Sequence, residues 1–307
     1  MVFPGQGSQS VGMLKGYDGL PGVDAVRTEA AAALGADFLR LLDDGPVEQL
    51  NLTVNTQPAM VTAAIAAYRA WLAAGGPAPA LVAGHSLGEY AALVAAGALT
   101  FADALPLVRF RAQAMQEAVP EGQGAMAAIL GLDDDAAMAA CDDAAQGEVV
   151  QAVNFNAPGQ VVIAGHKTAV ARAIEACKAR GAKRAMPLPV SAPFHSRLMQ
   201  AAAAKLADYL ETVVLASPGI PVLNNVDVKE EQDPFKIKDA LIRQAAAPVR
   251  WAETIRQMAE QGVTHVLECG PGKVLAGLVK RIDPRLQGIA AADRAGLEQA
   301  LALIKGG

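Results

Sequence analysis

The sequence predicts an α/β protein with a parallel sheet and an inserted ferredoxin-like βαββαβ subdomain. Residues 80–93 and 266–273 each begin as a short apolar strand and continue into a glycine-containing turn that a helical pattern follows. This order is typical of parallel strands whose turns lie at one edge of a sheet. Between these stretches, residues 124–188 change to short elements in the order strand, helix, strand, strand, helix, strand. These observations together indicate the fold class.

The first of these turns has the sequence Gly-His-Ser-Leu-Gly at residues 84–88. A serine between a strand and a helix in a Gly-x-Ser-x-Gly pattern is typical of a nucleophile elbow. The turn needs small residues on both sides, and glycine fits them without a steric clash. We therefore expect Ser86 to be a nucleophile, with the first helical amides, that of Leu87 among them, directed at a developing oxyanion.

The composition and net charge of the chain argue against several classes of function. The chain has 307 residues, of which 52% are hydrophobic, which indicates a large core. A net charge of −5 without a dense Lys/Arg block argues against nucleic acid as a partner. No uncharged apolar run reaches the roughly 18 residues of a membrane span. We expect no membrane association and, because the first residues do not resemble a signal peptide, a cytoplasmic location.

The three cysteines are far apart and outside any CxxC or histidine-rich spacing. This distribution argues against a disulfide framework and against a metal site. We therefore interpret Cys141, Cys177 and Cys269 as small core residues and expect no bound metal.

The first turn, Phe-Pro-Gly-Gln-Gly-Ser-Gln at residues 3–9, follows the end of a predicted strand. Its glycines allow backbone amides near Gln6 to approach a ligand. On this motif alone, a plain surface turn is an equal alternative. The turn is neither a GxGxxG motif nor a P-loop, so nucleotide binding is not expected.

Helical spacing predicts two or three helices before residue 50 and a long one over 56–74, with Met60 and Trp71 facing the core. Thr100 and Asp103 predict a capping box at the start of the next helix. Later helices are expected at 100–118, 198–210, 234–246 and 251–261.

The inserted subdomain is expected over 122–192, and the core over 1–121 and 193–307, with proline-containing linkers at both boundaries. Its predicted strands and helices follow from alternation and helical spacing. The strands are 125–130, 149–153, 160–164 and 183–188, and the helices are 133–145 and 167–180.

A base for Ser86 has to come from only four histidines. His85 is adjacent to Ser86, so its side chain should point elsewhere. His166 lies in a predicted turn of the subdomain, and His265 begins an apolar strand. His195, on a proline-constrained loop that re-enters the core, is the best placed candidate.

The sequence alone leaves the roles of three charged residues undecided. Arg109 and Arg111 lie on one largely apolar helix, where either forms a solvated stripe or binds a substrate carboxylate. Glu268, at the end of an apolar strand, is either a triad acid or a cap for the following helix.

Taken together, the motifs resemble the malonyl-CoA:acyl-carrier-protein transacylases, which are related to polyketide-synthase acyltransferase domains. The resemblance covers nearly the whole chain. It rests on Phe-Pro-Gly-Gln-Gly-Ser-Gln at 3–9, Gly-His-Ser-Leu-Gly-Glu at 84–89, the helix around Arg111, Asn-Phe-Asn at 154–156, Pro-Phe-His at 193–195 and Glu-Cys-Gly-Pro-Gly-Lys at 268–273.

The resemblance implies Ser86 as the acylated nucleophile and His195 as its base. It implies an oxyanion hole formed by the backbone amides of Gln6 and Leu87. In this family a main-chain carbonyl orients the histidine in place of an acid, and Gln244 resembles that position.

For the substrate, the resemblance implies Arg111 rather than Arg109 as the carboxylate anchor. Glu268 then has no triad role. An aromatic residue before the histidine, here Phe194, resembles the pattern of malonyl-selective enzymes. The implied fold is a hydrolase-like α/β core with a ferredoxin-like insert, and the first strand is a few residues short at Met1.

The implied reaction is a ping-pong transfer of malonyl from malonyl-CoA to the phosphopantetheine thiol of acyl carrier protein. Coenzyme A thioester is the substrate, so no cofactor is expected, and we expect a monomer. A serine thioesterase or lipase is the nearest alternative, because the elbow does not distinguish water from a thiol. A stand-alone polyketide-synthase acyltransferase and a non-catalytic carrier-binding module are the others.

The carrier protein is typically acidic in this family, whereas the chain itself has a net charge of −5. A locally basic docking face is therefore expected. The candidate pairs are Lys183 with Arg184 and Lys280 with Arg281, and a solvated surface without a partner is the alternative for each.

Overall fold

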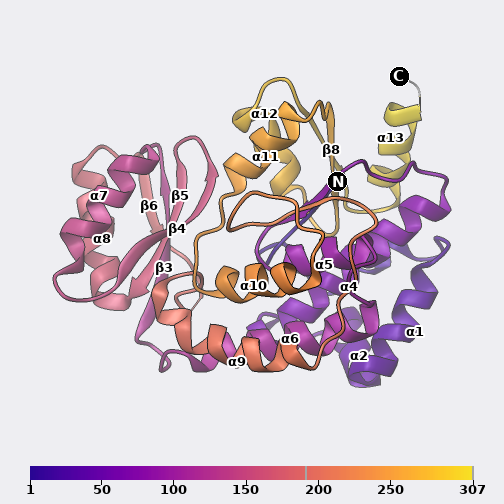
Figure 1. Ribbon diagram of the computed structural model, residues 1–307, viewed down its shortest axis with the longest axis horizontal. Coiled ribbons are helices and arrows are strands. Elements are labelled where there is room, and N and C mark those ends of the chain that lie inside the picture. Colours follow the sequence, from indigo (N-terminus) through magenta and orange to yellow (C-terminus); the bar gives the residue numbers. More distant parts are fainter. Residues whose placement is uncertain (191, 306–307) are drawn as a thin grey trace.

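The computed structural model describes residues 1–190 and 192–305, and their strands form two separate sheets (Figure 1). Ser191, in the expected linker and subdomain, and Gly306 and Gly307, in the expected core, lie outside the described residues. The first sheet has the strand order β7-β2-β1-β8-β9, and every neighbouring pair in it is parallel. Its strands are β1 (Val2–Phe3), β2 (Val82–Gly84), β7 (Val222–Leu223), β8 (His265–Cys269) and β9 (Gln287–Ala291). The predicted parallel α/β fold is confirmed.

Helices surround this parallel sheet. The N-terminal group comprises α1 (Val23–Leu34), α2 (Ala36–Asp44), α3 (Val47–Leu50), α4 (Thr53–Ala73), α5 (Gly88–Ala95) and α6 (Phe101–Glu117), with a short 3-10 turn at Lys15–Tyr17. The C-terminal group comprises α9 (Gln200–Glu211), α10 (Pro234–Ala245), α11 (Trp251–Glu260), α12 (Val274–Ile282) and α13 (Arg294–Lys305), with a 3-10 turn at Arg197–Met199.

The ends of these helices follow the local chemistry of the sequence. The Thr100 hydroxyl accepts a hydrogen bond from the Asp103 amide at 3.1 Å, so the predicted cap of α6 is confirmed. In α10, Pro234 occupies the first turn, where its missing amide hydrogen costs nothing, and the Asp233 carboxylate accepts from the Phe235 amide at 2.9 Å.

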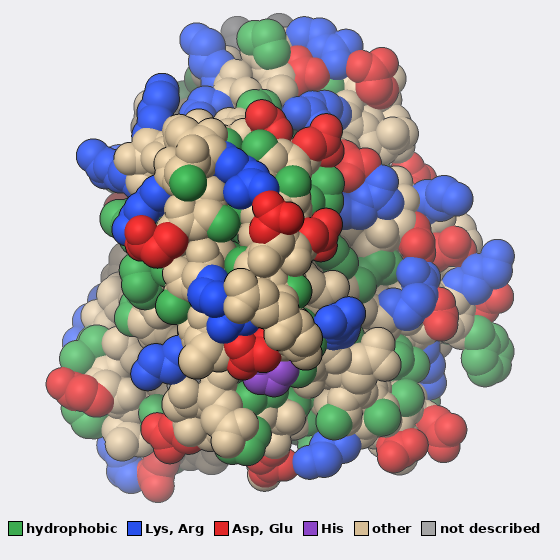
Figure 2. All heavy atoms as spheres, turned by 90° about the vertical axis from the view of Figure 1, so that its left-hand side faces the viewer, with side chains coloured by type: hydrophobic (Ala, Val, Ile, Leu, Met, Phe, Trp, Pro, Cys, Tyr) green, Lys and Arg blue, Asp and Glu red, His purple; other side chains and the backbone are tan. Residues whose placement is uncertain are grey.

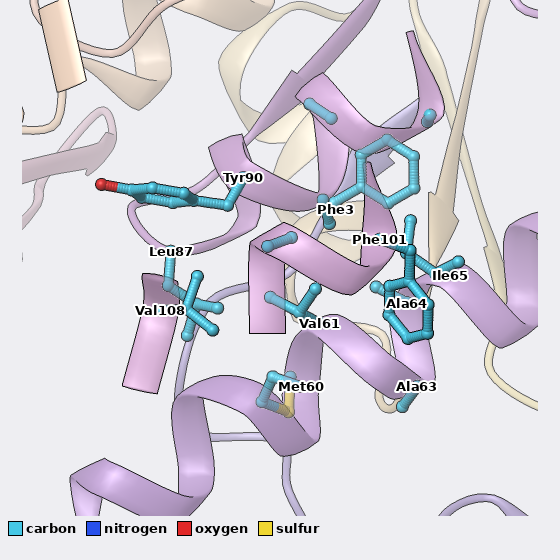
Figure 3. Packing of buried hydrophobic residues seen from close by; sticks show 14 of the residues in the cluster. Phe3, Met60, Val61, Ala63, Ala64, Ile65, Leu87, Tyr90, Phe101 and Val108 are labelled. Carbon is cyan, nitrogen blue, oxygen red and sulfur yellow. The ribbon is translucent and has the colours of Figure 1, made fainter. Parts of the chain in front are cut away.

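The core of the larger unit is centred on α4. This helix is buried along most of its length, and both Met60 and Trp71 are at most 1% exposed, as its spacing predicts. Figure 3 shows Leu87 and Val108 on one side of the cluster and Phe3 on the other, with side chains of α4 between them. Strand β1, helix α5 and helix α6 therefore share one core, and this core fixes the position of the turn before α5.

The second sheet is antiparallel and has the order β4-β5-β3-β6. Its strands are β3 (Gly124–Leu130), β4 (Val150–Ala157), β5 (Gln160–His166) and β6 (Arg184–Pro187), and its helices are α7 (Asp134–Ala145) and α8 (Lys167–Ala179). The helices pack on one face of this sheet, where Cys141 and Cys177 lie in the core (Figure 1). The order of the elements is the predicted βαββαβ order.

Strand β4 is longer than the expected strand over 149–153. Its irregular second half contacts the larger unit, where the Phe155 amide donates to the Val249 carbonyl at 3.0 Å and the Val249 amide donates to the Val153 carbonyl at 2.9 Å. The backbone of 154–157 is therefore extended partly because a segment nearly 100 residues away pairs with it. This contact places Asn154 and Asn156 beside the parallel sheet.

Among the described residues, none of the helices combines the length and the hydrophobicity needed to cross a membrane.

Candidate active site

The turn between β2 and α5 holds Ser86 in a strained conformation. Its φ is 53°, in the left-handed region that a non-glycine residue seldom adopts. Glycine is required at both flanking positions because other backbone atoms approach them closely. A Cβ on Gly84 would lie 1.8 Å from the Gly88 carbonyl carbon, and one on Gly88 would lie 2.2 Å from the Phe3 carbonyl oxygen. The turn therefore has the geometry that the motif predicts for a nucleophile elbow.

His195 is the histidine that the structure brings to Ser86. Its Nε2 lies 2.6 Å from Ser86 Oγ, and its Nδ1 lies 2.9 Å from the main-chain carbonyl oxygen of Gln244. Because a carbonyl only accepts, Nδ1 carries the proton and Nε2 is free to accept one from Ser86. Burial, and then the positive charge of Arg111, lower the pKa of His195 to about 3. The imidazole is therefore neutral at physiological pH.

The other three histidines have different partners. His85 Nε2 lies 2.8 Å from Asn156 Oδ1, and its ring packs against Trp251. His166 Nδ1 accepts from the Val149 amide at 2.9 Å within the subdomain. His265 is exposed at the start of β8.

Arg111, and not Arg109, points into the site. Its side chain is 1% exposed, and its guanidinium donates to Gln57 Oε1 at 2.8 Å, to Gln244 Oε1 at 2.9 Å and to Ser86 Oγ at 3.3 Å. Arg109 is half-buried over the ring of Phe38 on the outside of α6. The two arginines are two positions apart, so they lie on different faces of the helix.

A cavity opens above Ser86, between the larger unit and the antiparallel sheet. Its floor is polar, and its walls are mostly apolar, with His85 and Asn154 as their polar members. The floor includes Gln6, Gln57, Ser86, Arg111 and His195, and the walls are formed by Met115, Met126, Val162, Leu188, Val190 and Phe194. A small anionic acyl group fits such a site, with its charge at the floor and its carbon chain against the walls.

Gln6 and Leu87 flank Ser86 on two different turns. Gln6 lines the cavity, and its side-chain oxygen accepts from the Thr53 hydroxyl at 2.7 Å, which holds the first turn in place. Leu87 directly precedes α5, and its side chain is buried in the core. The backbone amide of Leu87 is therefore at the N-terminal end of that helix, where partial positive charge accumulates.

Glu268 bonds to the helix that follows it in the chain. Its Oε2 accepts from the Ala276 amide at 2.8 Å, in the first turn of α12, and burial raises its pKa to about 7. The Nδ1 atom of His195 is bonded to Gln244, as described above. Of the two interpretations left open by the sequence, the geometry supports the helix cap.

The comparisons with known proteins agree with this geometry. A family model described as an acyl transferase domain matches residues 1–297. The chain belongs to the acyl transferase family. It is 57% identical to malonyl CoA-acyl carrier protein transacylase of Escherichia coli (strain K12), over 98% of each chain.

Solved structures of this acyltransferase family superpose closely. The acyl-carrier-protein S-malonyltransferase of Burkholderia pseudomallei 1710b has a TM-score of 0.96 and 62% identity over 98% of each chain. A malonyl-transacylase solved with its type II PKS acyl-carrier protein has a TM-score of 0.96 and 54% identity, over 99% of this chain and 98% of that chain.

The sequence does not predict three polar residues of the acyltransferase site, which are Glu89, Asn225 and Gln57, the partner of Arg111. Glu89 and Asn225 are both buried next to Ser86, and Asn225 lies two residues after the short strand β7. The sequence signal for Glu89 is a glutamate that ends Gly-His-Ser-Leu-Gly-Glu on an otherwise mostly apolar helix. The signal for Asn225 is weaker, since β7 is only two residues long.

Proposed function

We propose that this acyltransferase moves a malonyl group from malonyl-CoA to the phosphopantetheine thiol of acyl carrier protein. The observation that carries the proposal is a buried cation beside a paired nucleophile and base. Arg111 Nη2 lies 3.3 Å from Ser86 Oγ, which in turn lies 2.6 Å from His195 Nε2. This arrangement suits an acyl group that has a carboxylate near its reacting carbonyl. The relatives named above, including one solved with a carrier protein, support the same donor and acceptor.

In the first half-reaction His195 Nε2 takes the proton from Ser86 Oγ as this oxygen bonds to the thioester carbonyl carbon. The carbonyl oxygen becomes negative, and the backbone amides of Gln6 and Leu87 are the groups that we assign to stabilise it. When the carbon–sulfur bond breaks, His195 returns the proton to the coenzyme A sulfur. A malonyl ester of Ser86 remains.

The second half-reaction reverses these steps with another thiol. His195 takes the proton of the phosphopantetheine thiol, and the sulfur attacks the malonyl ester. The proton then returns to Ser86 as the ester bond breaks, so the enzyme is regenerated. Each step uses groups of the protein and of the two thiol partners, and our proposal includes no further cofactor. A cytoplasmic location, which the three free cysteines favour, is part of the proposal.

Three variants test the chemical roles. Incubation with malonyl-CoA followed by peptide mass mapping should place malonyl on the peptide that contains Ser86, and Ser86→Ala should remove it. His195→Ala should slow acylation by about 10²- to 10⁴-fold without unfolding the protein. Replacing His265, which is exposed, is the matched control and should leave the rate unchanged.

The acceptor is tested in the same experiment. The isolated malonyl-enzyme should lose its label to carrier protein and only slowly to water. A malonylated peptide without residue 86 contradicts the assigned nucleophile. Release of free malonate at the same rate with and without carrier protein indicates a thioesterase instead.

A further inference from the structure

The backbone of the nucleophile elbow is held by a side chain from a distant segment. Asn225 Oδ1 accepts from the Ser86 amide at 2.7 Å, and Asn225 Nδ2 donates to the Gly84 carbonyl at 2.7 Å. Asn225 is fully buried. Because a strained residue persists only where its surroundings over-determine it, these bonds keep Ser86 at its positive φ.

Gln244 contacts the nucleophile, the base and the buried cation of the site. Its Nε2 donates to the Ser86 carbonyl at 2.9 Å, its Oε1 accepts from Arg111 at 2.9 Å, and its main-chain oxygen accepts from His195 Nδ1 at 2.9 Å. The orientation of this one carboxamide therefore matters for the nucleophile and the cation together.

Asn225 and Gln244 both bond to Glu89. The Oε2 atom of Glu89 accepts from the Gln244 side chain at 2.8 Å and from the backbone amide of Asn225 at 2.9 Å, and the residue is 3% exposed. We propose that Glu89 is a positioning residue whose ionised carboxylate fixes the orientation of the Gln244 carboxamide, and through it the geometry of Ser86 and Arg111. This inference rests on the proposed function, because its consequence is the rate of malonyl transfer.

The charge on Glu89 matters because of hydrogen-bond direction. An ionised carboxylate only accepts, so the Gln244 amide group must face it and the Gln244 oxygen must face Arg111. A protonated carboxyl can also donate, so the carboxamide is then held in this orientation only by the Ser86 carbonyl and Arg111. If it turns over, its amide group meets the guanidinium, donor against donor, and Arg111 loses an acceptor while the Ser86 carbonyl loses a donor.

Two charged groups face Glu89 from the elements around it. Burial is the largest influence and raises the pKa of Glu89 to about 7, against the hydrogen bonds from Gln244 and the Asn225 backbone, which lower it. Arg111 on α6 lowers this pKa less, and Asp227, beyond β7 and itself paired with Arg243 at 2.6 Å, raises it. The pKa of His195 is about 3, so the base does not titrate near neutrality. A loss of acylation as the pH falls below about 7 is therefore expected from Glu89.

The chain offers a matched control in Glu268. This carboxyl is also fully buried, and burial likewise raises its pKa to about 7. Its hydrogen bond goes to the Ala276 amide in α12 rather than to Asn225 or Gln244. A general effect of buried carboxyl groups would appear in both glutamates, whereas a positioning effect belongs to Glu89 alone.

The experiment measures kcat/KM for acylation by malonyl-CoA from about pH 5.5 to about pH 8.5. The kcat/KM of the wild type should fall about tenfold per pH unit below the pKa of Glu89. Glu89→Gln, which keeps the size and an acceptor oxygen but cannot ionise, should lose this pH dependence. Glu268→Gln should retain it.

Three results would each overturn the inference. In the first, Glu89→Gln keeps the fall in kcat/KM at low pH, and in the second, Glu268→Gln loses it. In the third, the kcat/KM of the wild type does not fall at low pH in this range. The wild-type profile needs no variant, so the inference stays testable if Glu89→Gln does not fold. A wild type that is not malonylated at any pH contradicts the proposed function itself. If the wild type is malonylated but its kcat/KM does not depend on pH as described, only the role of Glu89 is contradicted.

Discussion

Arg111 donates a hydrogen bond to Ser86 Oγ at 3.3 Å, so the buried cation and the nucleophile are in direct contact. In a malonyl group a single methylene separates the carboxylate from the thioester carbonyl. A cation that binds this carboxylate must therefore lie next to the atom that attacks the carbonyl. The contact between Arg111 and Ser86 meets that requirement, and a longer diacid would need a more distant cation.

Replacing Arg111 should change the choice of substrate. A charge-assisted bond contributes about 1.5–3 kcal/mol, so Arg111→Ala should lower kcat/KM for malonyl-CoA roughly ten- to hundredfold. Acetyl-CoA has no carboxylate to lose, and its kcat/KM should change far less. Arg109→Ala is the control, since Arg109 lies over Phe38 outside the cavity. Equal losses for both thioesters in Arg111→Ala would show that the arginine is structural.

Phe194 should exclude a methyl branch next to the carbonyl. Its ring lines the cavity directly before the base. We expect the wild type to prefer malonyl-CoA over methylmalonyl-CoA and Phe194→Ser to reduce this preference by about 1–3 kcal/mol, the usual effect of one methyl group in a pocket. Phe110→Ser is the control, because Phe110 stacks on Tyr209 away from the cavity. Equal kcat/KM for the two substrates in the wild type would refute the prediction.

Glu268 should make the protein less stable as the pH rises. Its folded pKa of about 7 exceeds the unfolded value near 4.5, so between these values the folded state binds more protons than the unfolded state. The free energy of unfolding therefore falls as the pH rises through this window, by up to about 3 kcal/mol from this group. Glu268→Gln should lack that loss.

Urea unfolding at low and at neutral pH measures this effect. Glu89 contributes with the same sign, and His195, whose folded pKa is lowered, contributes with the opposite sign. The quantity to compare is therefore the difference between Glu268→Gln and wild type at each pH. If that difference is the same above pH 7 and below pH 4.5, Glu268 does not titrate as described.

The sequence predicts those parts of the site that depend on local geometry. The elbow at Ser86 follows from two glycines, and the βαββαβ order follows from alternation and helical spacing within residues 124–188. The contact of Glu89 with Gln244 joins residues 155 positions apart, and no local pattern encodes it. The choice between Arg109 and Arg111 likewise depends on which face of α6 is turned toward Ser86 and Gln244. Only the fold, or a family resemblance, decides such contacts.

The carrier protein should dock at a locally basic surface, and the structure distinguishes the two candidate pairs. Arg281 donates to Gln160 Oε1 at 3.0 Å, so it already joins α12 to the subdomain. Lys183 and Arg184 are exposed at the start of β6. Figure 2 shows the face formed by the subdomain, where basic and acidic side chains are interspersed. On such a mixed surface a short basic pair is the feature that can steer an acidic partner.

Reversing both charges of Lys183 and Arg184 should therefore raise KM for carrier protein and weaken its dependence on salt, because electrostatic steering acts on encounter. Acylation by malonyl-CoA should be nearly unchanged, since the pair lies outside the cavity lining. Reversal of Lys280 and Arg281 tests the other pair, with Arg281→Gln alone as a control for the lost bond to Gln160. Unchanged carrier KM and salt dependence after both reversals would place docking on another surface.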